Sequence, residues 1–271
     1  MVSSARECAD GRFKWWGGVC MSFTLKSDPS FSFRKIEKLF LAAKLFSRFP
    51  RVHGAWPKYE YLKPWIVDQR PKTVIDIGIN IGQFLHLAVR LWPEAKIIGV
   101  EPTSDLAENM SQLYQDDERI TVEACAASDH AGEAVFHITK NSQNSSLLEP
   151  SASFVADRPD DGLLRTETVK LKRLDEIVQN VDGPFFVKID VQGAEMEVLR
   201  GFGDRLPDIE TLIVEAPFEE AYDGAGGFDD IYRFLADRGF DYAGPLGTLT
   251  SKKTGHVRQE DAVFVKRQAA S

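Results

Sequence analysis

The stretch VIDIGINIGQF, residues 74–84, combines two glycines with an acidic residue at the end of a hydrophobic run. A glycine turn after a buried strand lets the backbone approach a ligand closely. Asp76, however, precedes Gly78 by two positions, where a carboxylate repels a pyrophosphate and favours a cation, a hydroxyl or an amine. Asn80 also stands where the dinucleotide fingerprint G-x-G-x-x-G has its middle glycine, so the match to a nicotinamide site is poor.

A second acidic residue fits the same class of ligand. Glu101 closes the run IIGVE about twenty residues after the turn, where an acidic side chain can accept hydrogen bonds from ribose hydroxyls. S-adenosylmethionine carries a sulfonium, an ammonium and ribose hydroxyls, and it has no phosphate. We therefore expect Asp76 and Glu101 to bind this cationic nucleoside. Ala127 and Ser128 would border the adenine, although Ser128 and Asp129 equally fit a plain turn.

Two further carboxylates follow buried strands later in the chain. Asp190 comes directly after FFVKI, and Glu215 ends the run TLIVE. Acids at adjacent strand ends can deprotonate an alcohol, orient it, or bind a divalent ion that acidifies it. Magnesium fits these two acids, and so does a metal-free site. Glu195 is expected in the first turn of a helix, where the helix dipole favours negative charge.

Short apolar runs alternate with amphipathic segments after Pro71, which predicts a mainly parallel α/β sheet with right-handed crossovers. The last two apolar runs are predicted to pair as an antiparallel hairpin at one edge. The expected strands are 72–77, 96–100, 120–125, 185–189, 211–214, 240–243 and 262–265, and the expected helices are 83–91, 105–114 and 194–200. The polar stretch 141–166 is expected to be a lid, a binding loop or disorder.

Charge is distributed unevenly along the chain. Residues 1–60 contain eleven Lys or Arg and five Asp or Glu, a net charge of +6, so the remainder carries −14. Residues 31–49 predict a basic amphipathic helix that either covers a sheet face, which we favour, or contacts an anionic membrane or a biosynthetic complex. We expect an N-terminal segment, residues 1–65, followed by one catalytic domain, residues 66–268.

The composition excludes several classes of protein. The overall charge of −8 argues against a nucleic-acid binder, which needs a basic surface. No apolar run approaches the roughly 20 residues that span a bilayer, and the N-terminus lacks the apolar centre of a secretory signal. The three cysteines show no metal-binding spacing, so free thiols are expected. We therefore expect a cytoplasmic protein.

These residues resemble the FkbM-type methyltransferases, which use S-adenosylmethionine. The resemblance runs from about Thr73 to Lys266 and is specific because the markers occur together and in order. The family pattern usually reads D-I-G-A-N-I-G, so Ile79 replaces a small residue, a change that is tolerable if its side chain points into the sheet. The markers are VIDIGINIGQF, IIGVEP, NSSLL, VKLKRLDEI, FVKIDVQGAEMEVLRG, LIVEAPFEEAY and EDAVFVKR.

The resemblance implies a Rossmann-like, seven-stranded methyltransferase sheet and O-methylation of a hydroxyl, commonly on a sugar or a polyketide-like product. It implies that the cofactor lies against Asp76, Gly78, Asn80, Gly82 and Glu101. It also implies that the acceptor lies against Ser145, Ser146, Phe218 and Tyr222, for which a surface loop packed on the two aromatic residues is the plain alternative.

The reaction we expect is an in-line displacement at the sulfonium methyl by a substrate oxygen, with Asp190 as base or orienting group and Glu215 as second candidate. A nicotinamide oxidoreductase is disfavoured by Asp76 and Asn80. A non-catalytic relative acting in a polysaccharide or natural-product assembly complex stays open, as does an N-methyltransferase, although the chain lacks an Asn-Pro-Pro-Tyr-type motif. The acceptor and the oligomeric state are not fixed by the sequence.

Overall fold

The computed structural model describes residues 6–7, 13–14, 63–149, 162–219, 222, 224–251 and 254–268. The chain divides into two compact units, Met1–His53 and Gly54–Ser271. In the first unit, β1 (Arg6–Glu7) pairs antiparallel with β2 (Phe13–Lys14). The basic helix expected at 31–49 lies outside the described residues. Within the described ranges, no helix is long and apolar enough to cross a membrane.

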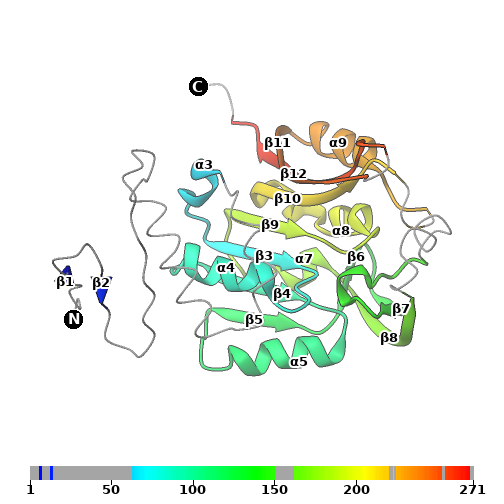
Figure 1. The fold of residues 1–271 in the computed structure, drawn as a ribbon, viewed down its shortest axis with the longest axis horizontal. Helices are drawn as coiled ribbons and strands as arrows, with labels where there is room; N and C mark the ends of the chain where they lie inside the picture. The colour runs from blue at the N-terminus through cyan, green and yellow to red at the C-terminus, as the bar shows by residue number, and fades with distance from the viewer. Residues whose placement is uncertain are drawn as a thin grey trace. The chain divides into compact units, whose positions relative to one another are not determined.

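The second unit contains a seven-stranded sheet with the order β11-β12-β10-β9-β3-β4-β5 (Figure 1). Five of the strands run parallel, whereas β12 runs antiparallel to β10 and β11 on its two sides. The predicted antiparallel hairpin at one edge is thus confirmed. The strands are β3 (Thr73–Ile77), β4 (Lys96–Val100), β5 (Ile120–Glu123), β9 (Phe185–Ile189), β10 (Ile209–Pro217), β11 (Phe240–Thr250) and β12 (Val257–Lys266).

Helices cover both faces of this sheet, because successive side chains of a strand point to opposite faces. Val74 packs in one core with residues of α3 and α4, whereas its neighbour Ile75 packs in a second core with residues of α8 and α9. The helices are α3 (Pro64–Val67), α4 (Gln83–Leu91), α5 (Ser104–Leu113), α7 (Leu174–Ile177), α8 (Glu195–Gly201) and α9 (Phe228–Ala236), and the 3₁₀ segments are η2 (Ser142–Asn144) and η3 (Gly203–Asp208).

A second sheet, with the order β6-β8-β7, lies beside one end of the first (Figure 1). Its strands are β6 (Ala126–Ser128), β7 (Gly132–Thr139) and β8 (Leu163–Arg173). This sheet was not predicted, and two predictions for this part of the chain were wrong. The strand predicted at 120–125 ends at Glu123, and the expected irregular stretch 141–166 runs into β8. The composition of β8 hid the strand, because seven of its eleven residues are polar or charged and only Val169 and Leu171 are buried.

Candidate active site

A cavity of about 210 Å³ opens at the carboxyl ends of the central strands. Strands β4 and β5 lie on one side of β3, and β9 and β10 lie on the other, so the order of the strands reverses between β3 and β9. Ligands of open α/β sheets bind at such a switch point. The residues predicted for the site that line this cavity are Asp76, Gly78, Asn80, Glu101, Ala127, Ser145, Asp190 and Glu215.

The turn after β3 requires glycine at its first position. Gly78 has a φ of 81°, and a Cβ atom there would lie 2.0 Å from the carbonyl oxygen of Asp190. The turn after β3 and the turn after β9 are therefore in direct contact. Asn80 also has a positive φ, of 49°, and its Oδ1 accepts hydrogen bonds from the Ile81 N–H at 2.8 Å and the Ser142 hydroxyl at 3.1 Å.

Gly82 does not line the cavity. It precedes the first residue of α4 with a φ of 80°, and a Cβ atom there would lie 2.6 Å from the sulfur of Met110. The glycine thus serves the close packing of the turn against α5. Ile79, the residue that departs from the family pattern, is buried, and its Cγ2 lies 3.0 Å from where a Cβ of Gly99 would stand. The larger side chain fits because β4 has no side chain at that position.

Asp76 is a buried carboxylate whose oxygens accept no hydrogen bond from the residues that the structure describes. The ammonium of Lys188 lies 4.0 Å from its Oδ1. Burial raises the pKa of Asp76 to about 6; Lys188 opposes this rise, and the nearby Asp190 adds to it. A buried carboxylate without hydrogen bonds carries a desolvation cost, which a cationic ligand or a ligand N–H or O–H group would reduce.

Glu101 links the end of β4 to the glycine turn. Its Oε2 accepts a hydrogen bond from the Asn80 N–H at 2.8 Å, and its Oε1 accepts one from the Thr103 N–H at 2.9 Å. Burial raises the pKa of Glu101, and these backbone hydrogen bonds oppose the rise. Because each carboxylate oxygen can accept more than one hydrogen bond, Glu101 retains capacity for ligand hydroxyls.

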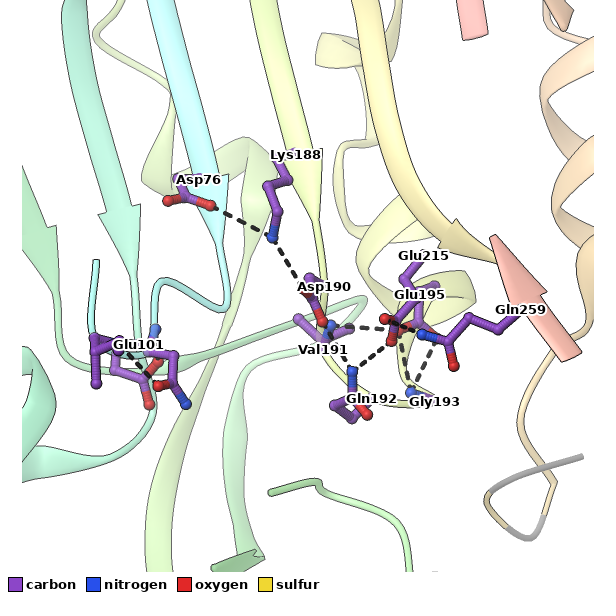
Figure 2. A network of polar contacts seen from close by, with 12 residues as sticks. Asp76, Glu101, Lys188, Asp190, Val191, Gln192, Gly193, Glu195, Glu215 and Gln259 are labelled. Carbon is purple, nitrogen blue, oxygen red and sulfur yellow. Dashed lines mark hydrogen bonds and ion pairs between the residues drawn. The ribbon is translucent and has the colours of Figure 1, made fainter. Parts of the chain in front are cut away.

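A chain of polar contacts continues from Asp76 across β9 to β10 (Figure 2). Lys188 donates to Asp190 Oδ2 at 3.1 Å, and the side-chain amide of Gln192 donates to Asp190 Oδ1 at 2.9 Å. The amides of Gln192 and Gln259 also donate to the two carboxylate oxygens of Glu215. Lys188, Gln192 and Gln259 were not among the predicted site residues. A charged residue inside the otherwise apolar strand FFVKI is the signal by which Lys188 could have been identified.

The turn between β9 and α8 is held in place by a buried acid. Gln192 and Gly193 have positive φ values of 57° and 108°. Glu195 accepts hydrogen bonds from the Gly193 N–H at 3.1 Å and the Val191 N–H at 3.3 Å. It is the first residue of α8, as predicted. Burial raises the pKa of Glu195 to about 7, and the hydrogen bonds from Gly193 partly offset this effect.

Two of the residues predicted to border the acceptor contact this turn from the far side. The hydroxyl of Ser146 donates to the carbonyl oxygen of Gln192 at 2.6 Å, and the hydroxyl of Tyr222 lies 3.0 Å from Gln192 Oε1. Tyr222 also lies within 3.2 Å of the carbonyl oxygen of Asn144. Ser146 and Tyr222 do not line the cavity themselves. They contact Gln192, which does line it.

Two other predicted site residues lie away from the cavity. Phe218 is half-exposed and stacks on Phe228, with 4.9 Å between the ring centroids. Ser128 is buried on β6, and its hydroxyl lies 3.2 Å from the Nδ1 of His130. Ala127, its neighbour in the chain, lines the cavity, whereas Ser128 does not.

The cavity residues fit S-adenosylmethionine better than they fit a metal ion. Asp76 offers a carboxylate that lacks hydrogen bonds, Glu101 offers acceptor capacity, and Gly78 keeps the floor of the turn free of a side chain. Throughout the described parts of the chain, no three His, Cys, Asp or Glu residues are grouped as a metal ion requires. The magnesium alternative therefore has no support from the described residues.

Comparison with known proteins also indicates a methyltransferase. The methyltransferase FkbM domain matches residues 76–242. The chain is 28% identical over 194 residues to methyltransferase sdnD of Sordaria araneosa, covering 62% of this chain and 73% of that protein. It is 25% identical over 177 residues to 2-O-methyltransferase NoeI of Sinorhizobium fredii, covering 59% of this chain and 69% of that protein.

Solved structures of methyltransferases are similar to this chain at low identity. The methyltransferase domain of bacterial CtHen1-C is 14% identical with a TM-score of 0.40, over 80% of this chain and 97% of that chain. The 1,6-didemethyltoxoflavin-N1-methyltransferase of Burkholderia thailandensis is 11% identical with a TM-score of 0.35, over 98% and 100% of the two chains. Because the FkbM domain covers more than half of the sequence, this chain belongs to the FkbM family of S-adenosylmethionine-dependent methyltransferases.

Proposed function

We propose that this protein transfers the methyl group of S-adenosylmethionine to a hydroxyl oxygen of a sugar, in a glycan or a natural product. When bound, the cofactor supplies a methyl group made electrophilic by the sulfonium. The observation that carries the proposal is the position of Asp190, which lines the cavity next to Asp76 and is held by Lys188 and Gln192. A carboxylate oriented in this way can accept a hydrogen bond from an incoming hydroxyl.

The donor half of the proposed site consists of Asp76, Gly78, Asn80 and Glu101. Asp76 pairs with positive charge on the ligand, and Glu101 accepts hydrogen bonds from the ribose hydroxyls. Ala127 lines the same cavity and provides an apolar surface for the adenine. The acids reject the phosphates of a dinucleotide by charge repulsion, so the proposal favours this donor over a nicotinamide cofactor.

The acceptor half of the proposed site consists of Asp190 and the polar groups beside it. A sugar hydroxyl is a weak nucleophile, so much of the rate enhancement comes from holding its oxygen in line with the methyl group. Asp190 orients this hydroxyl and takes its proton as the new bond forms. Glu215 also lines the cavity, where it accepts hydrogen bonds from the amides of Gln192 and Gln259, and it is the second candidate for the base.

Two observations favour an oxygen acceptor on a sugar. The residues that line the cavity include Gln192, Gln259 and Asn144, and amide groups hydrogen-bond well to rings that carry several hydroxyls. NoeI, a relative that covers most of the domain, is named a 2-O-methyltransferase. Neither observation favours a nitrogen acceptor or a role without catalysis.

The test uses methyl-labelled S-adenosylmethionine and a panel of monosaccharides and disaccharides, with matched amino sugars as the comparison. We expect label in an O-methyl ether that resists mild base, located by mass spectrometry and NMR. Label found only on the amines would refute the oxygen acceptor. Failure of S-adenosylmethionine and S-adenosylhomocysteine to bind in calorimetry, together with binding of NAD, would refute the proposed function as a whole.

A further inference from the structure

Lys188 is a buried cation in a strand that is otherwise apolar. It is 3% exposed, and on the neighbouring strand its register partner is Asp76. Its ammonium lies 3.1 Å from Asp190 Oδ2 and 4.0 Å from Asp76 Oδ1, between the two carboxylates (Figure 2). Burial of an ammonium group is costly unless the group is paired. The carboxylates of Asp76 and Asp190 therefore stabilise the positive charge of Lys188. The two acids belong to different halves of the proposed site.

Three further carboxylates on neighbouring elements add to the negative charge around Lys188, Asp76 and Asp190. Glu101 follows β4, Glu215 lies on β10, and Glu195 begins α8. Glu101 and Asp190 both raise the pKa of Asp76, whereas Lys188 lowers it. Asp190 also raises the pKa of Glu195. Two acids that share a buried site tend to hold one proton between them unless a cation compensates their charge.

We propose that Lys188 is a positioning residue for both halves of the site. Its ammonium holds Asp76 and Asp190 in their charged forms, so that one carboxylate pairs with the cationic donor and the other orients the acceptor hydroxyl. This inference rests on the proposed function, because it takes the roles of the two acids from there. The inference adds the Lys188 ammonium as a third group of the site. This group touches neither reactant and acts through both acids.

The experiment measures binding of S-adenosylmethionine to the full chain by calorimetry, across a range of pH and in buffers with different heats of ionisation. In Lys188→Met, the pair of carboxylates formed by Asp76 and Asp190 binds a proton in place of the missing positive charge. The cationic donor must displace that proton in order to bind. At pH 7 we expect the dissociation constant to rise by about tenfold and proton release to approach one per molecule bound. At high pH this proton is lost and the affinity recovers. The pH below which donor binding weakens is therefore higher in Lys188→Met than in the wild type.

Lys172→Met is the matched control. Lys172 forms an ion pair with Glu123 at 2.7 Å, its side chain is 43% exposed, and it does not line the cavity. We expect this variant to bind the donor with the affinity, pH profile and proton release of the wild type. If Lys188→Met also shows the wild-type profile and proton release, the inference about Lys188 is wrong while the proposed function stands. If the wild type does not bind S-adenosylmethionine, the proposed function itself fails.

A second variant covers the case in which Lys188→Met does not fold. Lys188→Met with Asp76→Asn removes both charges of one pair and keeps the shapes of the side chains. If Lys188 acts through its charge, this double variant is recovered as folded protein with a urea midpoint near that of the wild type. A double variant that is as unstable as the single variant would show that the packing of Lys188, and not its charge, is what matters, and would overturn the inference.

Discussion

Asp76, Glu101 and Asp190 carry the same chemical group, and the fold gives each of them different partners. Asp76 has no hydrogen bond among the described residues, Glu101 holds two backbone N–H groups, and Asp190 lies between an ammonium and an amide. These differences suit three tasks: attraction of a cation, recognition of ribose and orientation of an acceptor. At the scale of single residues, the partners rather than the residue types distinguish the proposed roles.

Asp190→Asn tests the acceptor half. The amide keeps the size of the side chain but removes the negative charge that accepts the proton. We expect methyl transfer to fall by about a hundredfold or more, while the dissociation constant for S-adenosylmethionine changes by less than about tenfold. Steady-state kinetics with the best acceptor from the sugar panel and calorimetry measure the two quantities. The control is Asp204→Asn, an exposed site, and equal turnover in both variants would remove Asp190 from the mechanism.

Glu101→Gln tests the donor half. The new amide keeps one carbonyl oxygen, so its NH2 group faces the backbone N–H of either Asn80 or Thr103, and the capacity to accept ribose hydroxyls is reduced. We expect the affinity for S-adenosylmethionine to fall by about 1–3 kcal/mol, which calorimetry can measure. Glu94→Gln, on the exposed surface, should leave the affinity unchanged. An affinity equal to that of the wild type would mean that Glu101 does not contact the donor.

At the scale of elements, the site depends on contact between the turn after β3 and the turn after β9. Gly78 lies against the backbone of Asp190, which places the turn proposed to bind the donor next to the residue proposed to orient the acceptor. Ser146 and Tyr222 hold the second turn from its other side through Gln192. A turn with two consecutive positive φ values is strained, and such strain persists only where the surroundings fix it.

Gly78→Ala tests this contact. The new Cβ atom would lie 2.0 Å from the Asp190 carbonyl oxygen, at a backbone φ of 81°. We expect a loss of about 2–4 kcal/mol in the free energy of unfolding, measured by urea denaturation, and weaker donor binding. Gly132→Ala is the control, because a Cβ atom there meets nothing within 4 Å, and its effect should stay within about 0.5 kcal/mol. Equal stability of the two variants would contradict this packing.

At the scale of the whole molecule, the buried acids make stability depend on pH. Burial raises the pKa of Asp76 to about 6 and that of Glu195 to about 7, and it also raises the pKa of Glu101. These groups bind protons more tightly in the folded state, so their contribution to stability is present at acid pH and is lost as the pH rises through the folded pKa values. His86 opposes this trend, because burial lowers its pKa to about 4.

Three acids outweigh one histidine, so we expect the ligand-free protein to lose stability between about pH 5 and about pH 7.5, by on the order of 3 kcal/mol. Urea denaturation followed by circular dichroism at several pH values measures this slope. Glu195→Gln removes one titrating group and should flatten the slope. A free energy of unfolding that rises steadily across this interval would show that these acids are not buried as the structure places them.

The sequence by itself determined the elements around the site and the main acids within it. Apolar runs of strand length, the glycines of the first turn and acids at strand ends are local patterns, and the strands 96–100 and 185–189 and the helix 83–91 were predicted with their observed bounds. The glycine turn was predictable because a left-handed backbone conformation excludes most other residues. The family followed from the order of these patterns along the chain.

Only the tertiary structure decided which side chains meet at the site. Gln259 reaches Glu215 from β12, and Ser146 reaches Gln192 from the far side of the turn, across more than forty positions of sequence in each case. The second sheet was also hidden, because its central strand β8 buries only two of its eleven residues. Such contacts depend on the register of neighbouring strands and the path of the loops, and local periodicity carries no information about either. The approach of Lys188 to Asp76 arises in the same way, from the alignment of β9 with β3, whereas its contact with Asp190 is local in the chain.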